Sequence, residues 1–173
     1  MRKKIKIGII LMAIAISVFV GYNLVSTVIR KQQVAKNIKT IPNFKYKNTN
    51  GGFFEKANLS PNKKTVFLYF NTTCEFCQEE TKQIKANLEK FKNVQLVFVS
   101  FEKPEIITKF AQNNQLNNYD FIYFLSDEQL DFSKTFDVSG LPTLVLYDQN
   151  QQLIEKLKGQ IKTEQLLKKL NSN

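Results

Sequence analysis

The stretch Thr65-Val66-Phe67-Leu68-Tyr69-Phe70-Asn71-Thr72-Thr73-Cys74-Glu75-Phe76-Cys77 changes its pattern of side chains in the middle. Residues 65–70 form a continuous run of β-favouring side chains, which predicts a strand buried on both faces. From Cys77 onward, apolar side chains recur every three or four residues, which predicts an amphipathic helix. One stripe of that helix consists of Cys77, Thr81, Ile84, Leu88 and Phe91. The two cysteines therefore lie where a buried strand turns into a helix.

This placement predicts redox chemistry for the cysteine pair. Cys74 is expected at a helix amino terminus, where unpaired N–H groups and the helix dipole favour a thiolate. Cysteines so placed have pKa values lowered from about 8.5 to about 3.5–7.5. Cys77 lies one turn further, at a spacing that is compatible with a disulfide. We expect Cys74 to attack a substrate disulfide and Cys77 to resolve the mixed disulfide; two idle core cysteines are the alternative.

Composition narrows the classes of function. The 173-residue chain has two cysteines and no histidine, fewer than the four Cys/His ligands of a structural zinc site, so we expect no metal and no cofactor. The net charge of +10 is high enough for a nucleic-acid-binding protein. However, residues 1–42 hold eight basic residues and no acidic one, whereas residues 43–173 are nearly balanced. The excess charge lies outside the folded part, and we expect no nucleic-acid partner.

The first 30 residues are predicted to be a membrane anchor. Residues 7–29 carry no charge over 23 positions, and a helix of that length reaches about 34 Å, enough to cross a hydrocarbon core of about 30 Å. Basic residues flank the segment: Arg2, Lys3, Lys4, Lys6, Arg30 and Lys31. A cleaved signal peptide is the alternative, but no Ala-x-Ala-like site follows the apolar run. Basic residues are balanced on the two sides, so charge alone does not set the orientation.

The remaining chain alternates predicted strands and helices. Further strands are expected at 43–47, 52–54, 94–101, 121–125, 143–147 and 153–158, the last two as a hairpin. Helices are expected from Pro104, at 128–136, and from Thr163, which is expected to cap the last helix. These helices are predicted to bury Ile106, Ile107, Phe110, Ala111, Leu166, Leu167 and Leu170.

This alternation predicts an α/β fold in which helices flank a central sheet. We expect a mostly parallel sheet with right-handed crossovers, to which the closing hairpin adds an antiparallel edge, so that the sheet is mixed. The predicted boundaries are 1–30 for the anchor, 31–42 for a polar linker and 43–173 for one folded domain.

Two motifs resemble a known family. Residues 72–80, Thr-Thr-Cys-Glu-Phe-Cys-Gln-Glu-Glu, resemble the active-site turn of the thioredoxin superfamily. More narrowly, they resemble the C-x-x-C-x-x-E pattern of the membrane-anchored TlpA/ResA-like group, and Glu80 matches the glutamate of that pattern. Residues 136–148, Phe-Asp-Val-Ser-Gly-Leu-Pro-Thr-Leu-Val-Leu-Tyr-Asp, resemble the segment that carries the family's cis-proline, with Pro142 in its place. The interval from Cys77 to Pro142 is 65 residues long. Its length is similar to that in the TlpA/ResA-like group, in which this interval is longer than in plain thioredoxin.

The resemblance implies a thioredoxin-like fold over 43–173 and a membrane-tethered thiol–disulfide oxidoreductase, with Cys74, Cys77, Glu80 and Pro142 as site residues. In this family the glutamate assists proton transfer and the cis-proline helps to hold the substrate backbone. The implied partners are protein thiols and disulfides, apocytochrome c among them, and a membrane electron donor. The implied location of the domain is extracytoplasmic, in a periplasm or at the cell surface. For Glu80, a solvated helix face is the alternative.

The sequence departs from the family within the turn. Thr73 stands in place of the usual tryptophan before the first cysteine, and Phe76 in place of the frequent proline before the second. Because redox potential depends on how the thiolate is stabilised, these changes leave the direction of electron flow open. Two other functions stay open. One is a peroxiredoxin-like thiol peroxidase, although that family's threonine three residues before its cysteine is Asn71 here; the other is a redox-inactive binding module of thioredoxin fold.

Overall fold

The chain divides into two compact units between Lys36 and Asn37. The computed structural model describes residues 2–172, with side chains described for residue 12 and residues 14–172. The described part of the first unit belongs to one helix, α1 (Arg2–Asn37), whose last residue falls in the second unit. This helix continues into the stretch expected to be a linker. Within the described residues, one segment is long and apolar enough to cross a membrane, Ile14–Asn37, and none of its apolar window is buried.

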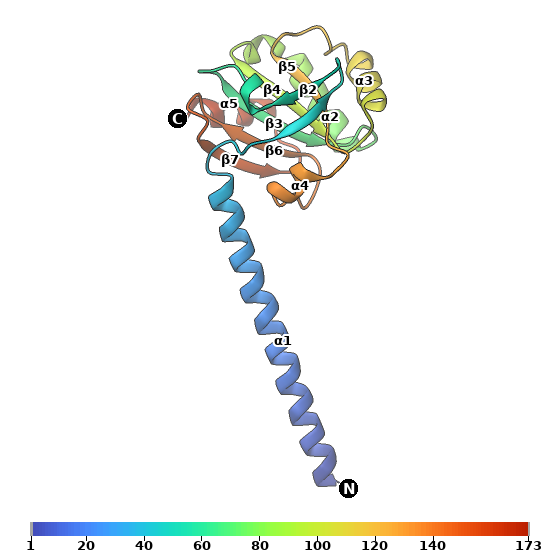
Figure 1. Ribbon diagram of the computed structural model, residues 1–173, viewed down its shortest axis with the longest axis vertical. Helices are drawn as coiled ribbons and strands as arrows, with labels where there is room; N and C mark the ends of the chain where they lie inside the picture. The colour runs from blue at the N-terminus through green and yellow to red at the C-terminus, as the bar shows by residue number, and fades with distance from the viewer. Residues whose placement is uncertain (1, 173) are drawn as a thin grey trace. The chain divides into compact units, whose positions relative to one another are not determined.

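A seven-stranded mixed sheet forms the centre of the second unit (Figure 1). Its strands are β1 (Lys45–Asn48), β2 (Phe53–Glu55), β3 (Lys64–Phe70), β4 (Val94–Ser100), β5 (Ile122–Ser126), β6 (Thr143–Tyr147) and β7 (Leu153–Lys158). Their order is β2-β1-β5-β4-β3-β6-β7. The mixed α/β class is confirmed. The expectation of a mostly parallel sheet is wrong, because β3–β4 and β4–β5 are parallel and the other four described pairings are antiparallel.

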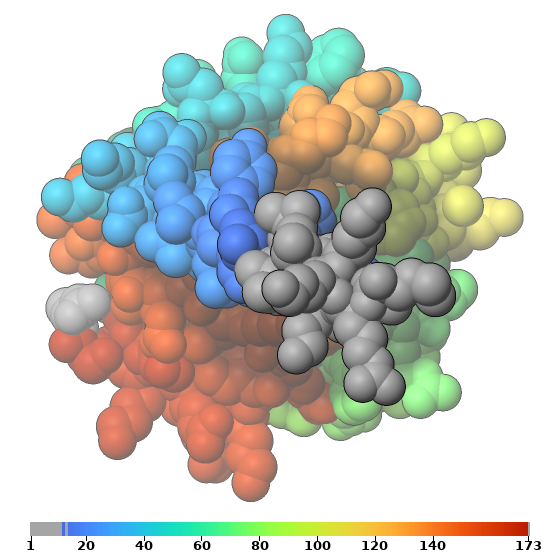
Figure 2. All heavy atoms as spheres, turned by 90° about the horizontal axis from the view of Figure 1, so that it is seen from below, coloured from blue at the N-terminus to red at the C-terminus, as the bar shows by residue number. Residues whose placement is uncertain are grey.

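Helices cover both faces of the sheet (Figure 1). Three helices, α2 (Glu75–Ala86), α3 (Pro104–Asn113) and α5 (Thr163–Asn171), contribute side chains to one large apolar cluster. The short α4 (Asp131–Thr135) packs its phenylalanine against the other face. Figure 2 shows the C-terminal elements, in red, on one side of the folded domain and the α3 region, in yellow, on another.

Three local predictions are wrong. The predicted helix through Phe91 ends at Ala86, because the Asn87 side chain donates to the Gln83 carbonyl (3.0 Å) and a 3-10 turn (Leu88–Phe91) follows. The cap of α5 is Lys162, since Thr163 is already its first residue. Ile106 is 44% exposed, whereas the other predicted apolar positions of α3 are buried. The remaining predicted elements lie within a few residues of the observed ones.

The central strand β3 is buried on both faces, as predicted. Successive side chains of a strand point to opposite faces, and Val66, Leu68 and Phe70 join the apolar cluster under α2. On the other face, the rings of Phe67 and Tyr69 contact Phe132 of α4, with ring centroids 5.9 and 4.9 Å apart. Because β4 and β6 flank β3, its last residue has a fixed position, from which the cysteine turn begins.

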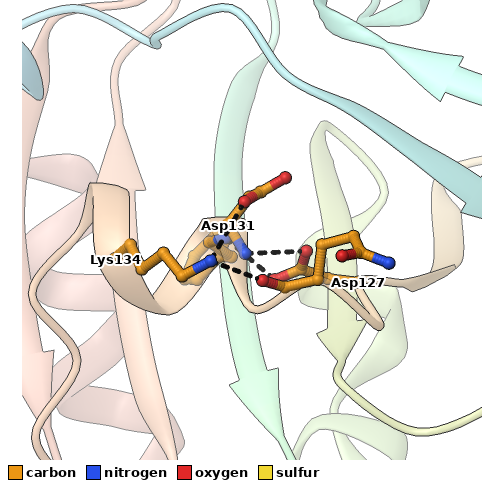
Figure 3. A network of polar contacts seen from close by, with 5 residues as sticks. Asp127, Asp131 and Lys134 are labelled. Carbon is orange, nitrogen blue, oxygen red and sulfur yellow. Dashed lines mark hydrogen bonds and ion pairs between the residues drawn. The ribbon is translucent and has the colours of Figure 1, made fainter.

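A buried carboxylate holds the start of α4 (Figure 3). Asp127 is 3% exposed, and its carboxylate accepts hydrogen bonds from the backbone N–H groups of Asp131 (3.0 Å) and Phe132 (2.8 Å). Burial raises the pKa of Asp127, although the two N–H groups oppose the shift. Lys134 pairs with Asp131 at 3.6 Å on the exposed side. Asp127 thereby holds the first turn of α4, the helix that precedes the loop with Pro142.

We expect Asp127→Ala to lower the free energy of unfolding by about 1–2 kcal/mol, because two helix N–H groups lose their acceptor. Asp131→Ala is the control and is expected to cost less than about 0.5 kcal/mol, since its ion pair is solvent-exposed. Chemical denaturation at pH 7 measures both. Equal losses in the two variants would contradict the role given to Asp127.

Candidate active site

The two cysteines lie at the first turn of α2. Cys74 is the residue that precedes the helix, and its Sγ accepts a hydrogen bond from the Cys77 backbone N–H at 3.4 Å. The Cys74 N–H donates to the Asn71 carbonyl (3.2 Å), which closes the turn after β3. Both cysteines are free thiols. The turn thus places a backbone donor against the sulfur of Cys74, as the sequence predicts for a helix amino terminus.

The two thiols differ in burial. Cys74 is partly exposed, whereas Cys77 is 0% exposed. Burial raises the pKa of Cys77 to about 12, and the hydrogen bond with Cys74 and the charge of Glu80 act in the same direction. At neutral pH, Cys77 therefore keeps its proton and Cys74 is the thiol within reach of another molecule.

Glu80 lies one helical turn after Cys77 and is 0% exposed. Its Oε2 accepts a hydrogen bond from the Ile161 N–H at 2.8 Å, and among the described residues its Oε1 has no hydrogen-bond partner. Burial raises the pKa of Glu80 to about 7, against the opposing effect of the Ile161 N–H. The alternative of a solvated helix face is wrong, because this carboxyl group is buried behind the cysteines.

Pro142 lies at the same end of the sheet as the cysteine turn. The Leu141–Pro142 peptide bond is cis, and Pro142 is buried. Thr143 pairs with Tyr69 in the β6–β3 register, so Pro142 lies level with the end of β3. The preceding loop is held by Lys156, whose Nζ donates to two of its backbone carbonyls, at 2.6 and 3.1 Å.

A further residue holds the cysteine turn from outside the two motifs. The Glu102 carboxylate accepts hydrogen bonds from the Thr72 N–H and hydroxyl, both at 2.8 Å, and from the Ser100 hydroxyl at 3.0 Å. Its carbonyl accepts from the Ser126 hydroxyl at 2.7 Å. Glu102 thereby joins the turn to the ends of β4 and β5. No motif predicts it, because its contact with Thr72 depends on the parallel register of β3 and β4.

The surroundings include one groove beside the turn. It has a volume of about 420 Å³ and extends from Thr72 along α2 and α3. Among the described residues, no three Cys, Asp or Glu side chains lie close enough together to hold a metal ion. Exposed aromatic side chains near the turn are those of Phe76 (64%) and Phe101 (38%).

Known proteins that are similar to this chain share its thioredoxin-like fold. The model of the AhpC/TSA family matches residues 38–162. The thiol-disulfide oxidoreductase ResA of Bacillus cereus is 28% identical over 168 residues, which are 96% of this chain and 95% of that protein. StoA from Bacillus subtilis aligns with a TM-score of 0.60 at 19% identity, over 76% of this chain and 98% of that one. Peroxidoxin BcpB from Mycobacterium tuberculosis aligns with a TM-score of 0.65 at 17% identity, over 77% and 94%. The predicted thioredoxin-like fold is confirmed.

We expect Glu80→Gln to stabilise the protein above about pH 7. Well below pH 4.5 the carboxyl group is neutral in both the folded and the unfolded chain, so it contributes no pH dependence. As the pH rises from about 4.5 to about 7, Glu80 ionises in the unfolded chain before it ionises in the folded protein. The wild type therefore loses stability on the order of 3 kcal/mol relative to the variant. Thermal unfolding from pH 4 to 8 measures this, with the exposed Glu79→Gln as control. A constant difference between wild type and Glu80→Gln over this range would contradict it.

We expect Glu102→Ala to lower the free energy of unfolding by about 1–3 kcal/mol and to speed amide hydrogen exchange at Thr72, because the Thr72 N–H and hydroxyl lose their acceptor. Glu102→Gln keeps a hydrogen-bond acceptor, so the Thr72 amide should remain largely protected from hydrogen exchange. Glu105→Ala, at an exposed position of α3, is the matched control. Unchanged exchange at Thr72 in Glu102→Ala would show that the carboxylate does not hold the turn.

Proposed function

Because the chain belongs to the AhpC/TSA family and has the thioredoxin-like fold of an oxidoreductase, we propose that it exchanges disulfides with protein substrates through Cys74 and Cys77. The main support for this proposal is one contact: the partly exposed sulfur of Cys74, at the start of α2, accepts a hydrogen bond from the backbone N–H of the fully buried Cys77. The 28% identity to a thiol-disulfide oxidoreductase over nearly the whole chain supports it.

The exchange proceeds in two displacements. The Cys74 thiolate attacks one sulfur of the substrate disulfide; that S–S bond breaks, and the other substrate sulfur leaves as a thiolate. Cys77 then loses its proton and attacks Cys74 Sγ. The mixed disulfide breaks, the Cys74–Cys77 disulfide forms, and the second substrate thiolate leaves. The substrate gains two electrons and the protein loses two, and the reverse sequence oxidises a dithiol.

Glu80 is proposed to take the proton in the second step. Cys77 is a poor acid because burial raises its pKa to about 12, so its attack needs a base. A carboxyl group with a pKa raised to about 7 can both accept and return a proton near neutral pH. Its Oε1 has no hydrogen-bond partner among the described residues and can accept a proton, which supports this role. Pro142 is proposed to face the cysteines and to help hold the substrate backbone.

The amino-terminal helix is proposed to tether the enzyme to a membrane. The proposed parts are an anchor at 1–30, a linker at 31–42 and a catalytic domain at 43–173 on the extracytoplasmic side. The length and the exposed apolar side chains of Ile14–Asn37 support the anchor. A tether raises the effective concentration of the domain beside a membrane-bound electron donor. Apocytochrome c is a candidate substrate in this location.

A thiol peroxidase is the second candidate, which the likeness in fold to a peroxidoxin favours. Against it stands Asn71, whose Oδ1 accepts hydrogen bonds from the Thr73 N–H (2.9 Å) and hydroxyl (2.6 Å). These contacts occupy the side chain where peroxiredoxins have a threonine. Turnover of hydrogen peroxide, compared with reduction of insulin disulfides, separates the two functions.

We expect Cys77→Ser to accumulate mixed disulfides with substrate proteins through Cys74, because the resolving thiol is missing. Mass spectrometry of the adducts would identify the substrates. The Cys74→Ser variant is the control and should form few adducts, since Cys77 is buried. Adducts that form equally well through Cys77 would contradict the assigned order of attack.

A further inference from the structure

A groove leads away from the cysteine turn between two helices on the same face of the sheet. It begins at Thr72, whose carbonyl accepts a hydrogen bond from the Gln78 side chain at 2.8 Å, and has a volume of about 420 Å³. Gln78 and Lys82 line it from α2 at i, i+4 spacing, and Ile106 and Lys109 line it from α3. The groove is therefore continuous with the turn that carries Cys74.

The lining of the groove is basic, with apolar and amide groups beside the charges. Two lysines line it, and none of the described residues that line it is acidic. Lys82 lies 4.0 Å from Glu79, but both side chains are at least half exposed, so this pair is weak. Among the described residues, Lys109 forms no ion pair. Both ammonium groups can therefore bind a carboxylate of another molecule.

We propose that this groove binds an acidic stretch of the polypeptide whose disulfide reacts at Cys74. The inference rests on the proposed function and names the class of substrate. An extended peptide advances about 3.3 Å per residue, so a chain that is bound covalently at Cys74 reaches the groove within a few residues.

The chemistry of the lining fits a peptide. Side-chain amides of Gln78 and Asn113 offer both donors and acceptors, which match backbone N–H and C=O groups. The 44% exposed Ile106 offers an apolar surface for an aliphatic side chain. Lys82 and Lys109 select acidic side chains over basic ones, since like charges repel. Glu102, which fixes Thr72, keeps the beginning of the groove in register with the cysteines.

The test uses the full-length reduced protein in detergent and three synthetic peptides. Each peptide contains one intramolecular disulfide, flanked by four Glu, four Gln or four Lys residues. At low ionic strength we expect the Glu peptide to be reduced about tenfold faster than the Gln peptide, and the Lys peptide to be slowest. High salt should remove the preference.

Two double variants locate the effect. Lys82→Glu with Lys109→Glu should reverse the order of the peptides. A small uncharged disulfide, reduced by the wild type and by each variant, measures disulfide exchange without a peptide in the groove. Lys90→Glu with Lys168→Glu changes the net charge equally at two exposed positions away from the groove, and should keep the order.

The outcomes are distinguishable. Equal rates for the three peptides, or loss of the preference in both double variants alike, would overturn the groove inference while leaving disulfide exchange intact. Failure of the wild type to reduce any of the peptides or the small disulfide would overturn the proposed function, and the groove inference with it.

Discussion

The hydrogen bond from the Cys77 N–H to the Cys74 sulfur forms because α2 begins one short turn after a strand that is paired on both sides. β3 is held by β4 and β6 along its length and is buried on both faces. The turn that follows is fixed a second time, by the carboxylate of Glu102 on Thr72. With strand and turn both held, the Cys77 N–H in the first turn of α2 points at the Cys74 sulfur. The burial of Cys77 and Glu80 follows from the same placement, since both lie on the inner face of α2.

In this arrangement the two cysteines lie in different environments. Cys74 is partly exposed and can meet a substrate, whereas Cys77 and Glu80 lie in the protein interior with pKa values raised by burial. A buried carboxyl group that lowers stability above neutral pH supports the role in proton transfer that is proposed for Glu80. The cis Leu141–Pro142 segment lies level with the end of β3, which supports the proposal that a substrate backbone binds between that loop and Cys74.

Much of the fold is predictable from the sequence because local patterns determine it. The apolar run of β3, the hairpin of β6 and β7 and the cysteine spacing at the start of α2 are visible in a few residues each. Features that depend on contacts distant in sequence are not visible. Glu102 reaches Thr72 only through the register of β3 and β4, and Ile106 is exposed because α3 and α2 are separated by a groove. The burial of Glu80 depends on the loop that carries Ile161.

The most direct measurement is the rate at which each cysteine is alkylated in the reduced, folded protein. Iodoacetamide is added at pH 7, the reaction is stopped at intervals, and mass spectrometry of the digested protein gives the modified fraction at Cys74 and Cys77. We expect Cys74 to react at least about ten times faster than Cys77, because Cys77 is buried and keeps its proton. Equal rates, or faster reaction at Cys77, would contradict the assignment of Cys74 as the attacking sulfur.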